Sequence, residues 1–201
     1  MSAHDKEEDP RIEGIKSTIH IIRDFPKPGG EFLDVNTLLL NPKAFKDAID
    51  LFVEQYKGKH ISVVAGVEAR GFIFGAPIAL GIGAKFVTLR KPNKLPGKVM
   101  RTEYSLEYGN DCLETQVGVI NDGELALLVD DVIATGGTLC AAINLLERNG
   151  AQVVECACVF GIRQLKGHQR LNELGKPLFV LMDGEGACEL IPKGKKIAAV
   201  I

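Results

Sequence analysis

The chain has 201 residues but no tryptophan, only three tyrosines and five cysteines. So few aromatic rings leave little surface on which the bases of a single-stranded nucleic acid could stack. The cysteines lack the C-x-x-C spacing of zinc sites, and their odd number does not suit a disulfide framework. We therefore interpret them as reduced thiols. The four histidines are scattered and form no metal-ligand pattern.

A strong charge of either sign and a long apolar run are missing too. Lys and Arg total 24 against 26 Asp and Glu, so no positive field draws the chain to nucleic acid or to an anionic membrane. No stretch reaches the roughly 20 apolar residues that cross a bilayer, and the charged N-terminus is unlike a signal peptide. These absences predict a cytoplasmic protein with neither nucleic acid nor membrane as a partner.

The composition is that of an ordinary globular protein, and strand and helix patterns alternate along it. With 46% hydrophobic and 25% charged residues, the chain suits a single domain over residues 1–201. Short β-branched runs alternate with helical periodicity, which predicts an α/β fold with a central, mostly parallel sheet flanked by helices. Strands are expected at 60–66, 84–90, 125–132, 153–162 and 177–182, and a short antiparallel excursion at 104–119. Helices are expected at 10–23, 42–56, 72–80, 139–150 and 165–174, with loops at 24–34 and 91–102.

The segment most informative about chemistry is LALLVDDVIATGGTL, residues 125–139. Asp130 and Asp131 stand where an apolar strand ends, and Gly136 and Gly137 open the helix that follows. Open α/β sheets bind ligands at the carboxyl ends of their strands. Carboxylates are costly to bury without partners, which sugar hydroxyls would supply, and glycines let backbone N–H groups approach a phosphate. The pattern favours a sugar-phosphate site.

Competing interpretations of the glycine-containing motifs have less support. The plainest is an Asp-rich turn followed by a glycine-containing helix start. A P-loop is excluded because no G-x-x-x-x-G-K-[ST] occurs, and the Gly81-Ile82-Gly83 sequence lacks the third glycine of a dinucleotide fingerprint. The sequence GGEF at 29–32 matches the signature of diguanylate cyclases, but it lies in a proline-rich segment and is treated as a coincidence.

The segment VDDVIATGGT resembles the phosphoribosyl-pyrophosphate motif of the type I phosphoribosyltransferases. The blocks FPKPGGEFLD, AGVEARGFIFG, LRKPNKLPG and YSLEYG follow in the order and spacing of the adenine phosphoribosyltransferases. The resemblance implies the type I phosphoribosyltransferase fold, with a small N-terminal hood (10–34) over the base site and a mobile lid loop (91–108). It also implies purine salvage by transfer of the 5-phosphoribosyl group from phosphoribosyl pyrophosphate to N9 of adenine, giving AMP and pyrophosphate. Mg²⁺ is the implied cofactor and a homodimer the implied assembly.

The resemblance assigns roles to individual residues. The expected catalytic residues are Glu107, as general acid or base near the purine, and Arg70. Phosphoribosyl pyrophosphate and AMP are expected to bind Asp130, Asp131, Ala134, Thr135, Gly136, Gly137 and Thr138. Pyrophosphate is expected to bind Arg70, Arg90, Lys91, Lys94 and Tyr108, beside a strained peptide at Glu68–Ala69. Adenine is expected to bind Glu31, Phe32 and Leu33. Mg²⁺ is expected to be held mainly through the substrate, without a direct protein ligand.

Two departures from the family pattern concern the base. Family members commonly carry a basic residue where this chain has Leu33, and an apolar neighbour where it has Glu31. Two alternatives therefore stay open: a 6-oxopurine phosphoribosyltransferase for hypoxanthine, guanine or xanthine, and a non-catalytic regulator that senses phosphoribosyl pyrophosphate. The slightly acidic charge, the lid and Glu107 speak against the regulator, as does the lack of a winged-helix pattern before residue 60. The tail over 183–201 lies beyond the matched blocks.

Overall fold

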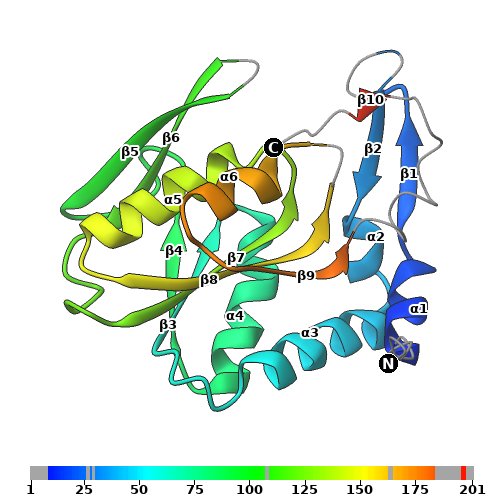
Figure 1. The fold of residues 1–201 in the computed structure, drawn as a ribbon, viewed down its shortest axis with the longest axis horizontal. Helices are drawn as coiled ribbons and strands as arrows, with labels where there is room; N and C mark the ends of the chain where they lie inside the picture. The colour runs from blue at the N-terminus through cyan, green and yellow to red at the C-terminus, as the bar shows by residue number, and fades with distance from the viewer. Residues whose placement is uncertain are drawn as a thin grey trace, which may run out of the picture.

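The computed structural model describes residues 9–25, 28, 30–106, 109–162, 165–183 and 196–197. The helices are α1 (Pro10–Lys16), α2 (Asn36–Leu39), α3 (Pro42–Tyr56), α4 (Arg70–Ile82), α5 (Gly137–Arg148) and α6 (Gly167–Glu173). The strands are β1 (His20–Arg23), β2 (Gly30–Asp34), β3 (Val63–Val67), β4 (Lys85–Leu89), β5 (Val99–Leu106), β6 (Gly109–Gln116), β7 (Leu125–Ile133), β8 (Gln152–Gly161), β9 (Leu178–Asp183) and β10 (Lys196–Ile197). Figure 1 shows them as a central body with a small sheet and a hairpin attached.

The central sheet confirms the predicted α/β fold. Its strands lie in the order β4-β3-β7-β8-β9, and every neighbouring pair is parallel. Parallel neighbours need crossover connections, and α4, α5 and α6 each supply one between adjacent strands. Because β7 is the middle strand, the segment that follows it emerges between the carboxyl ends of β3 and β8.

Both faces of this sheet are buried. Along β7, Leu127 and Val129 pack into a core with α3 and α4, whereas Ala126 and Leu128 pack into a second core with α5 and α6. Alternate side chains of a strand point to opposite faces, so an uninterrupted apolar run is what a strand covered on both sides requires. The central position of β7 therefore holds its carboxyl end in a rigid setting.

The predicted helix over 10–23 is wrong in its second half. The helix α1 ends at Lys16, where the hydroxyls of Ser17 and Thr18 donate to backbone carbonyls three residues earlier. The isoleucine-rich stretch after it forms β1, which pairs antiparallel with β2 at 30–34, a segment expected to be a loop. Isoleucines at steps of three and four suit a helix, but β-branched residues pack at least as well on a pleated strand.

The segment 91–108, expected to be a lid loop, contains a strand. Within its described part, only 91–98 lacks regular structure, and β5 pairs antiparallel with β6 along its whole length. The expected antiparallel excursion is therefore present, but it begins earlier than 104. The hairpin is fastened to α5, where Arg148 donates to the carbonyl of Arg101 and to the hydroxyl of Thr102, both at 3.1 Å.

A second sheet, which we call the hood, consists of β1, β2 and β10. In it β10 runs parallel to β2, with Lys196 opposite Gly30 and Ile197 opposite Glu31, so the tail returns to the N-terminal part of the chain. Figure 1 shows the hood on the right and the β5–β6 hairpin at the upper left, with α5 and α6 between them. Among the described residues, no helix has the length and apolar character that spanning a membrane would take.

Candidate active site

The segment after β7 forms the bend that the sequence predicts. Asp130 and Asp131 lie near the carboxyl end of the strand and are 8% and 4% exposed. The following residues, 134–138, turn into α5, and Gly136 adopts a φ of 77°, a left-handed conformation that favours glycine. The first N–H groups of a helix have no partner within it. The bend therefore presents amide donors a few residues from two carboxylates, as a bound sugar phosphate would require.

Close backbone contacts explain the glycines around the bend. A Cβ on Gly71, at the start of α4, would lie 2.7 Å from the carbonyl oxygen of Val129. A Cβ on Gly136 would lie 3.0 Å from the Cα of Gly167. The N–H of Gly167 donates to the carbonyl of Ala134 at 2.9 Å, and a Cβ on Gly167 would collide with that same oxygen. The start of α4 and the start of α6 thus pack directly on the backbone of β7 and the bend.

An ion pair joins α4 to the acid pair. The Nε of Arg70 donates to Oδ2 of Asp131, and the backbone N–H of Asp131 donates to Oδ1 of Asp130 at 2.9 Å. Burial, with the charge of Asp131 beside it, raises the pKa of Asp130 well above its ordinary value of 3.8. The sheet edge therefore holds one carboxylate paired with an arginine and one whose charged form is disfavoured by burial and by its charged neighbour.

A second ion pair lies where β3 and β4 end, because parallel pairing brings these ends together. Arg90 donates through Nε and Nη2 to the carboxylate of Glu68 at 3.2 and 3.1 Å, and the backbone N–H of Lys91 donates to it at 2.8 Å. The hydrogen bond from Arg90 lowers the pKa of Glu68. The Glu68–Ala69 peptide is cis. The structure thus brings Arg90 and Lys91 beside the turn that leads to Arg70.

The hairpin engages Lys91. Its Nζ forms an ion pair with Asp111 and a hydrogen bond of 3.3 Å with the Tyr104 hydroxyl, which itself donates to Asp111 at 3.1 Å. Burial raises the pKa of Tyr104, whose phenol also lies near the hydroxyl of Thr138. Lys94, further along the loop, is exposed. Of the predicted cations, Lys91 is held by the hairpin and Lys94 faces solvent.

The hood supplies the aromatic ring expected for a base. Phe32 is half-buried on β2 and meets Phe25 edge to face, with ring centroids 5.2 Å apart. Leu33 is 7% exposed and its side chain packs into the core, so a contact between Leu33 and a base would involve its backbone. The backbone of Glu31 pairs within β2, but its side chain lies outside the described part of the chain. The charge of Asp34, at the end of β2, acts on Arg70, which places the hood near the acid pair.

Glu107 and Tyr108 lie outside the described residues. They fall between Leu106 and Gly109, which pair as the last residue of β5 and the first of β6. The roles expected of both residues stay predictions.

Two residues that shape the site are not among the expected binding or catalytic residues, although one of them, Glu68, is named for its peptide with Ala69. Glu68 holds Arg90 and Lys91, and a signal existed: it is an acid at the end of one strand, and the basic residues end the next strand. Gly167 packs on the bend, but a lone glycine at the start of a helical pattern does not predict a contact with Ala134, which lies 33 positions earlier. Its role became visible only in three dimensions.

The donors at this edge suit a metal ion that arrives with its ligand. In the described ranges, no group of three or more His, Cys, Asp or Glu side chains is arranged to hold a metal ion. Asp130 and Asp131 nevertheless offer carboxylate oxygens beside the bend. Mg²⁺ is usually bound largely through the phosphates of a substrate, with one or two carboxylates nearby, so this edge suits an ion that is held mainly through the substrate.

Comparisons with known proteins agree with this arrangement. The chain matches the family described as phosphoribosyl transferase domain over residues 34–184. Adenine phosphoribosyltransferase 3 of Arabidopsis thaliana is 66% identical over 183 residues, which cover 91% of this chain and 99% of that relative. A similar solved structure is adenine phosphoribosyltransferase from Saccharomyces cerevisiae complexed with D-2,5-dideoxy-2,5-imino-altritol 1,6-bisphosphate and adenine. It has a TM-score of 0.80 at 36% identity, and the match covers 86% of this chain and 98% of the yeast chain. The structure of APRTase from Giardia lamblia complexed with 9-deazaadenine has a TM-score of 0.82 at 34% identity, with coverages of 87% and 98%.

Proposed function

Because the chain belongs to the adenine phosphoribosyltransferase family, we propose that it transfers the 5-phosphoribosyl group of phosphoribosyl pyrophosphate to N9 of adenine. The products are AMP and pyrophosphate, and the reaction serves purine salvage. The observation that carries this proposal is the meeting of the buried acid pair, the glycine bend and Arg70 at one edge of the sheet. The yeast and Giardia relatives, whose structures contain adenine and 9-deazaadenine, favour adenine over an oxopurine.

In the proposed reaction, the bond from C1′ of the ribose to the pyrophosphate oxygen breaks and N9 of adenine bonds to C1′. Positive charge grows on the sugar ring and negative charge on the leaving group, so groups of opposite sign held in place lower the barrier. Asp130 and Asp131 would accept hydrogen bonds from the ribose hydroxyls, and the carboxylate of Asp131, paired with Arg70, would stabilise the cationic ring. The amides of 134–138 would hold the 5′-phosphate.

The leaving pyrophosphate would be bound by Arg70, Arg90, Lys91 and Lys94, joined by Tyr108. Lys91 is paired with Asp111 of the hairpin in this structure, so it would exchange that partner for the substrate. Such an exchange couples the 91–98 loop to substrate binding and supports the assignment of 91–108 as a lid that keeps water from the reactive sugar. Mg²⁺ bound with the substrate supplies further neutralisation of the pyrophosphate charge.

Adenine would stack on Phe32, with backbone groups of Glu31 and Leu33 reading its edge. Glu107 would accept the proton that leaves N9 as the new bond forms. A main-chain contact at 33 needs no basic side chain, so the departure from the family pattern at that position is compatible with adenine as the base.

We also propose that the protein is a homodimer in the cytoplasm. Size-exclusion chromatography with light scattering would test the homodimer, and a fluorescent fusion would test the compartment.

The proposal is tested by incubating the purified protein with phosphoribosyl pyrophosphate, Mg²⁺ and one purine at a time: adenine, hypoxanthine, guanine or xanthine. Nucleotide should form from adenine, and its formation should fall when Mg²⁺ is removed with a chelator. Nucleotide from an oxopurine instead would indicate the 6-oxopurine alternative. Binding of phosphoribosyl pyrophosphate without nucleotide from any base would indicate the regulator.

A further inference from the structure

The bend proposed to hold the 5′-phosphate lacks a positive side chain. Residues 134–138 are ATGGT, and the two acids Asp130 and Asp131 precede them closely. Arg70 is already paired with Asp131. A phosphate monoester carries about two negative charges at neutral pH. Amides and a helix dipole contribute only partial charges, so a dianion beside an ionised carboxylate calls for a full positive charge from elsewhere in the fold.

The fold brings one lysine to this place through backbone contacts. Lys166 directly precedes Gly167, whose N–H donates to the carbonyl of Ala134 at 2.9 Å. The Cα of Gly167 also lies so close to Gly136 that a Cβ there would be 3.0 Å away. The backbone of residue 166 is therefore a neighbour of the bend, although 30 residues separate Lys166 from Gly136 in the chain.

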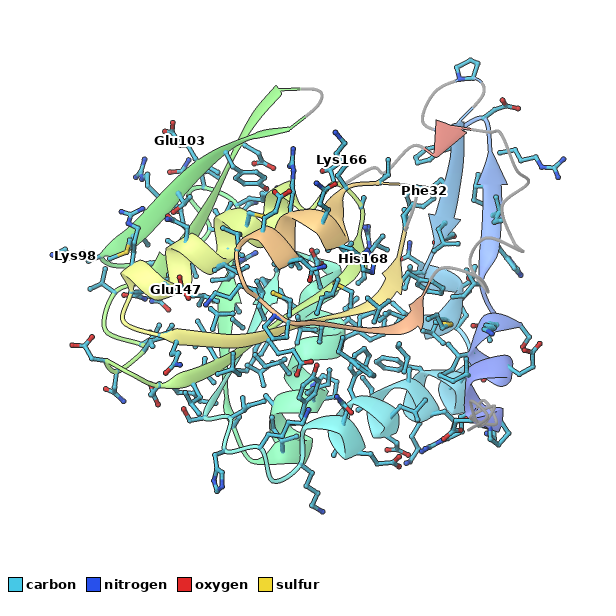
Figure 2. All side chains as sticks on the ribbon, in the orientation of Figure 1. Phe32, Lys98, Glu103, Glu147, Lys166 and His168 are labelled. Carbon is cyan, nitrogen blue, oxygen red and sulfur yellow. The ribbon has the colours of Figure 1, made fainter. Side chains whose placement is uncertain are left out.

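The side chain of Lys166 is free to act there. It is exposed, and it forms no ion pair or side-chain hydrogen bond with any residue that the structure describes. Figure 2 shows it at the top of the core, between the hairpin and the hood strand that carries Phe32, pointing away from the body of the protein. By contrast, Arg90 and Lys91 have carboxylate partners, Glu68 and Asp111.

We propose that Lys166 is a binding residue for the 5′-phosphate of the ribose, where it supplies the cation that the neutral bend lacks. The identification of this phosphate rests on the proposed function. A lysine suits the task because its ammonium is a compact charge on a flexible stem, which can reach a phosphate already held by amides. Lys166 should contribute equally to the affinity for phosphoribosyl pyrophosphate, AMP and ribose 5-phosphate, since all three carry the same 5′-phosphate.

The test uses the full-length protein and three probes, namely ribose 5-phosphate, inorganic pyrophosphate and adenine, with binding measured by isothermal titration calorimetry. Lys166→Gln should weaken ribose 5-phosphate binding by about 10- to 100-fold, the worth of one hydrogen bond to a charged group. Its affinities for pyrophosphate and adenine should equal those of the wild type. Lys166→Arg should restore most of the lost affinity.

The matched control is Lys57→Gln, which removes the same charge at the end of α3, the side of the sheet where β3 begins. It should bind ribose 5-phosphate as the wild type does. Equal ribose 5-phosphate binding by Lys166→Gln and wild type would overturn the inference, as would a loss confined to pyrophosphate. Failure of the proposed function has a different signature, the absence of AMP from adenine, and it leaves the effect of Lys166→Gln on ribose 5-phosphate measurable.

Discussion

The two ends of the site are built by different parts of the molecule. The phosphate end stands on β7, the middle strand of a five-stranded sheet with a core on each face, and its acid pair is almost fully buried. The base end stands on the hood, a three-stranded sheet in which Ile22 is 41% exposed, and Phe25, just after β1, is 45% exposed. Residues 34–184, which match the phosphoribosyl transferase domain family, include all of the phosphate end but, of the hood strands, only Asp34 at the end of β2.

This difference indicates where amino-acid substitutions should cost the protein little stability. Backbone atoms around the bend approach one another as closely as glycine allows, so a change there disturbs β7, α4 and α6 together. The hood touches solvent on part of its surface, so its exposed residues, such as Ile22, can change without opening a core. We therefore expect the phosphate end to fix the shared chemistry, and the hood to set the affinity for the base.

Asp131→Ala should produce the largest effect, because it removes a buried carboxylate and leaves Arg70 without its partner. Truncating one member of a buried charge pair costs about 2–5 kcal/mol, so the affinity for phosphoribosyl pyrophosphate should fall by about 100-fold or more. The measurement is the KM for phosphoribosyl pyrophosphate beside calorimetry with ribose 5-phosphate. Asp50→Ala, which breaks a surface ion pair with Lys46, is the control and should leave both values unchanged. Unchanged affinity in Asp131→Ala would show that the acid pair does not bind the ribose.

Gly71→Ala should come next, since its Cβ would lie 2.7 Å from a backbone oxygen of β7. Neither backbone can give way easily, so the free energy of unfolding should fall by about 1–3 kcal/mol. Gly14→Ala makes the same chemical change in α1, where nothing lies within 4 Å, and should raise stability by up to about 1 kcal/mol. Urea unfolding followed by circular dichroism measures both. Equal effects of the two substitutions would mean that the packing around the bend is looser than the structure shows.

Much of the phosphate end could be predicted from the sequence, because its signals are local. An apolar run, two acids and a glycine turn fall within 15 residues, and together they specify strand, site and helix. The hood was mispredicted because Ile19 and Ile22 lie at helical spacing whereas Ile19 and Ile21 lie at the alternation of a strand, and only the pairing of β1 with β2 decides between them. The two-residue strand β10 and the contact of Gly167 with Ala134 depend on long-range packing, which no short pattern encodes.

Phe32→Ala tests the base end with a smaller expected effect. Stacking of a base on an aromatic ring is worth about 1–3 kcal/mol, and the half-buried ring of Phe32 should contribute near the lower limit. We expect the KM for adenine to rise about tenfold while the KM for phosphoribosyl pyrophosphate stays as in the wild type. Phe32→Tyr keeps the ring and should behave as the wild type does. A rise in the KM for phosphoribosyl pyrophosphate alone would show that Phe32 serves the binding of phosphoribosyl pyrophosphate and not of adenine.

Removal of residues 184–201 should have the smallest effect and would sharpen the comparison most. It deletes β10, which pairs with β2 at Gly30 and Glu31, the two residues before Phe32. Loss of a few hydrogen bonds at a sheet edge, each worth about 1 kcal/mol or less there, should raise the adenine KM by about two- to fivefold without altering binding of ribose 5-phosphate. Ile197→Pro in the full-length chain removes one N–H from β10 and should reproduce the direction of the change. If the truncated protein instead lost affinity for ribose 5-phosphate, the tail would serve the phosphate end, and the division between a rigid core site and a separable hood would fail.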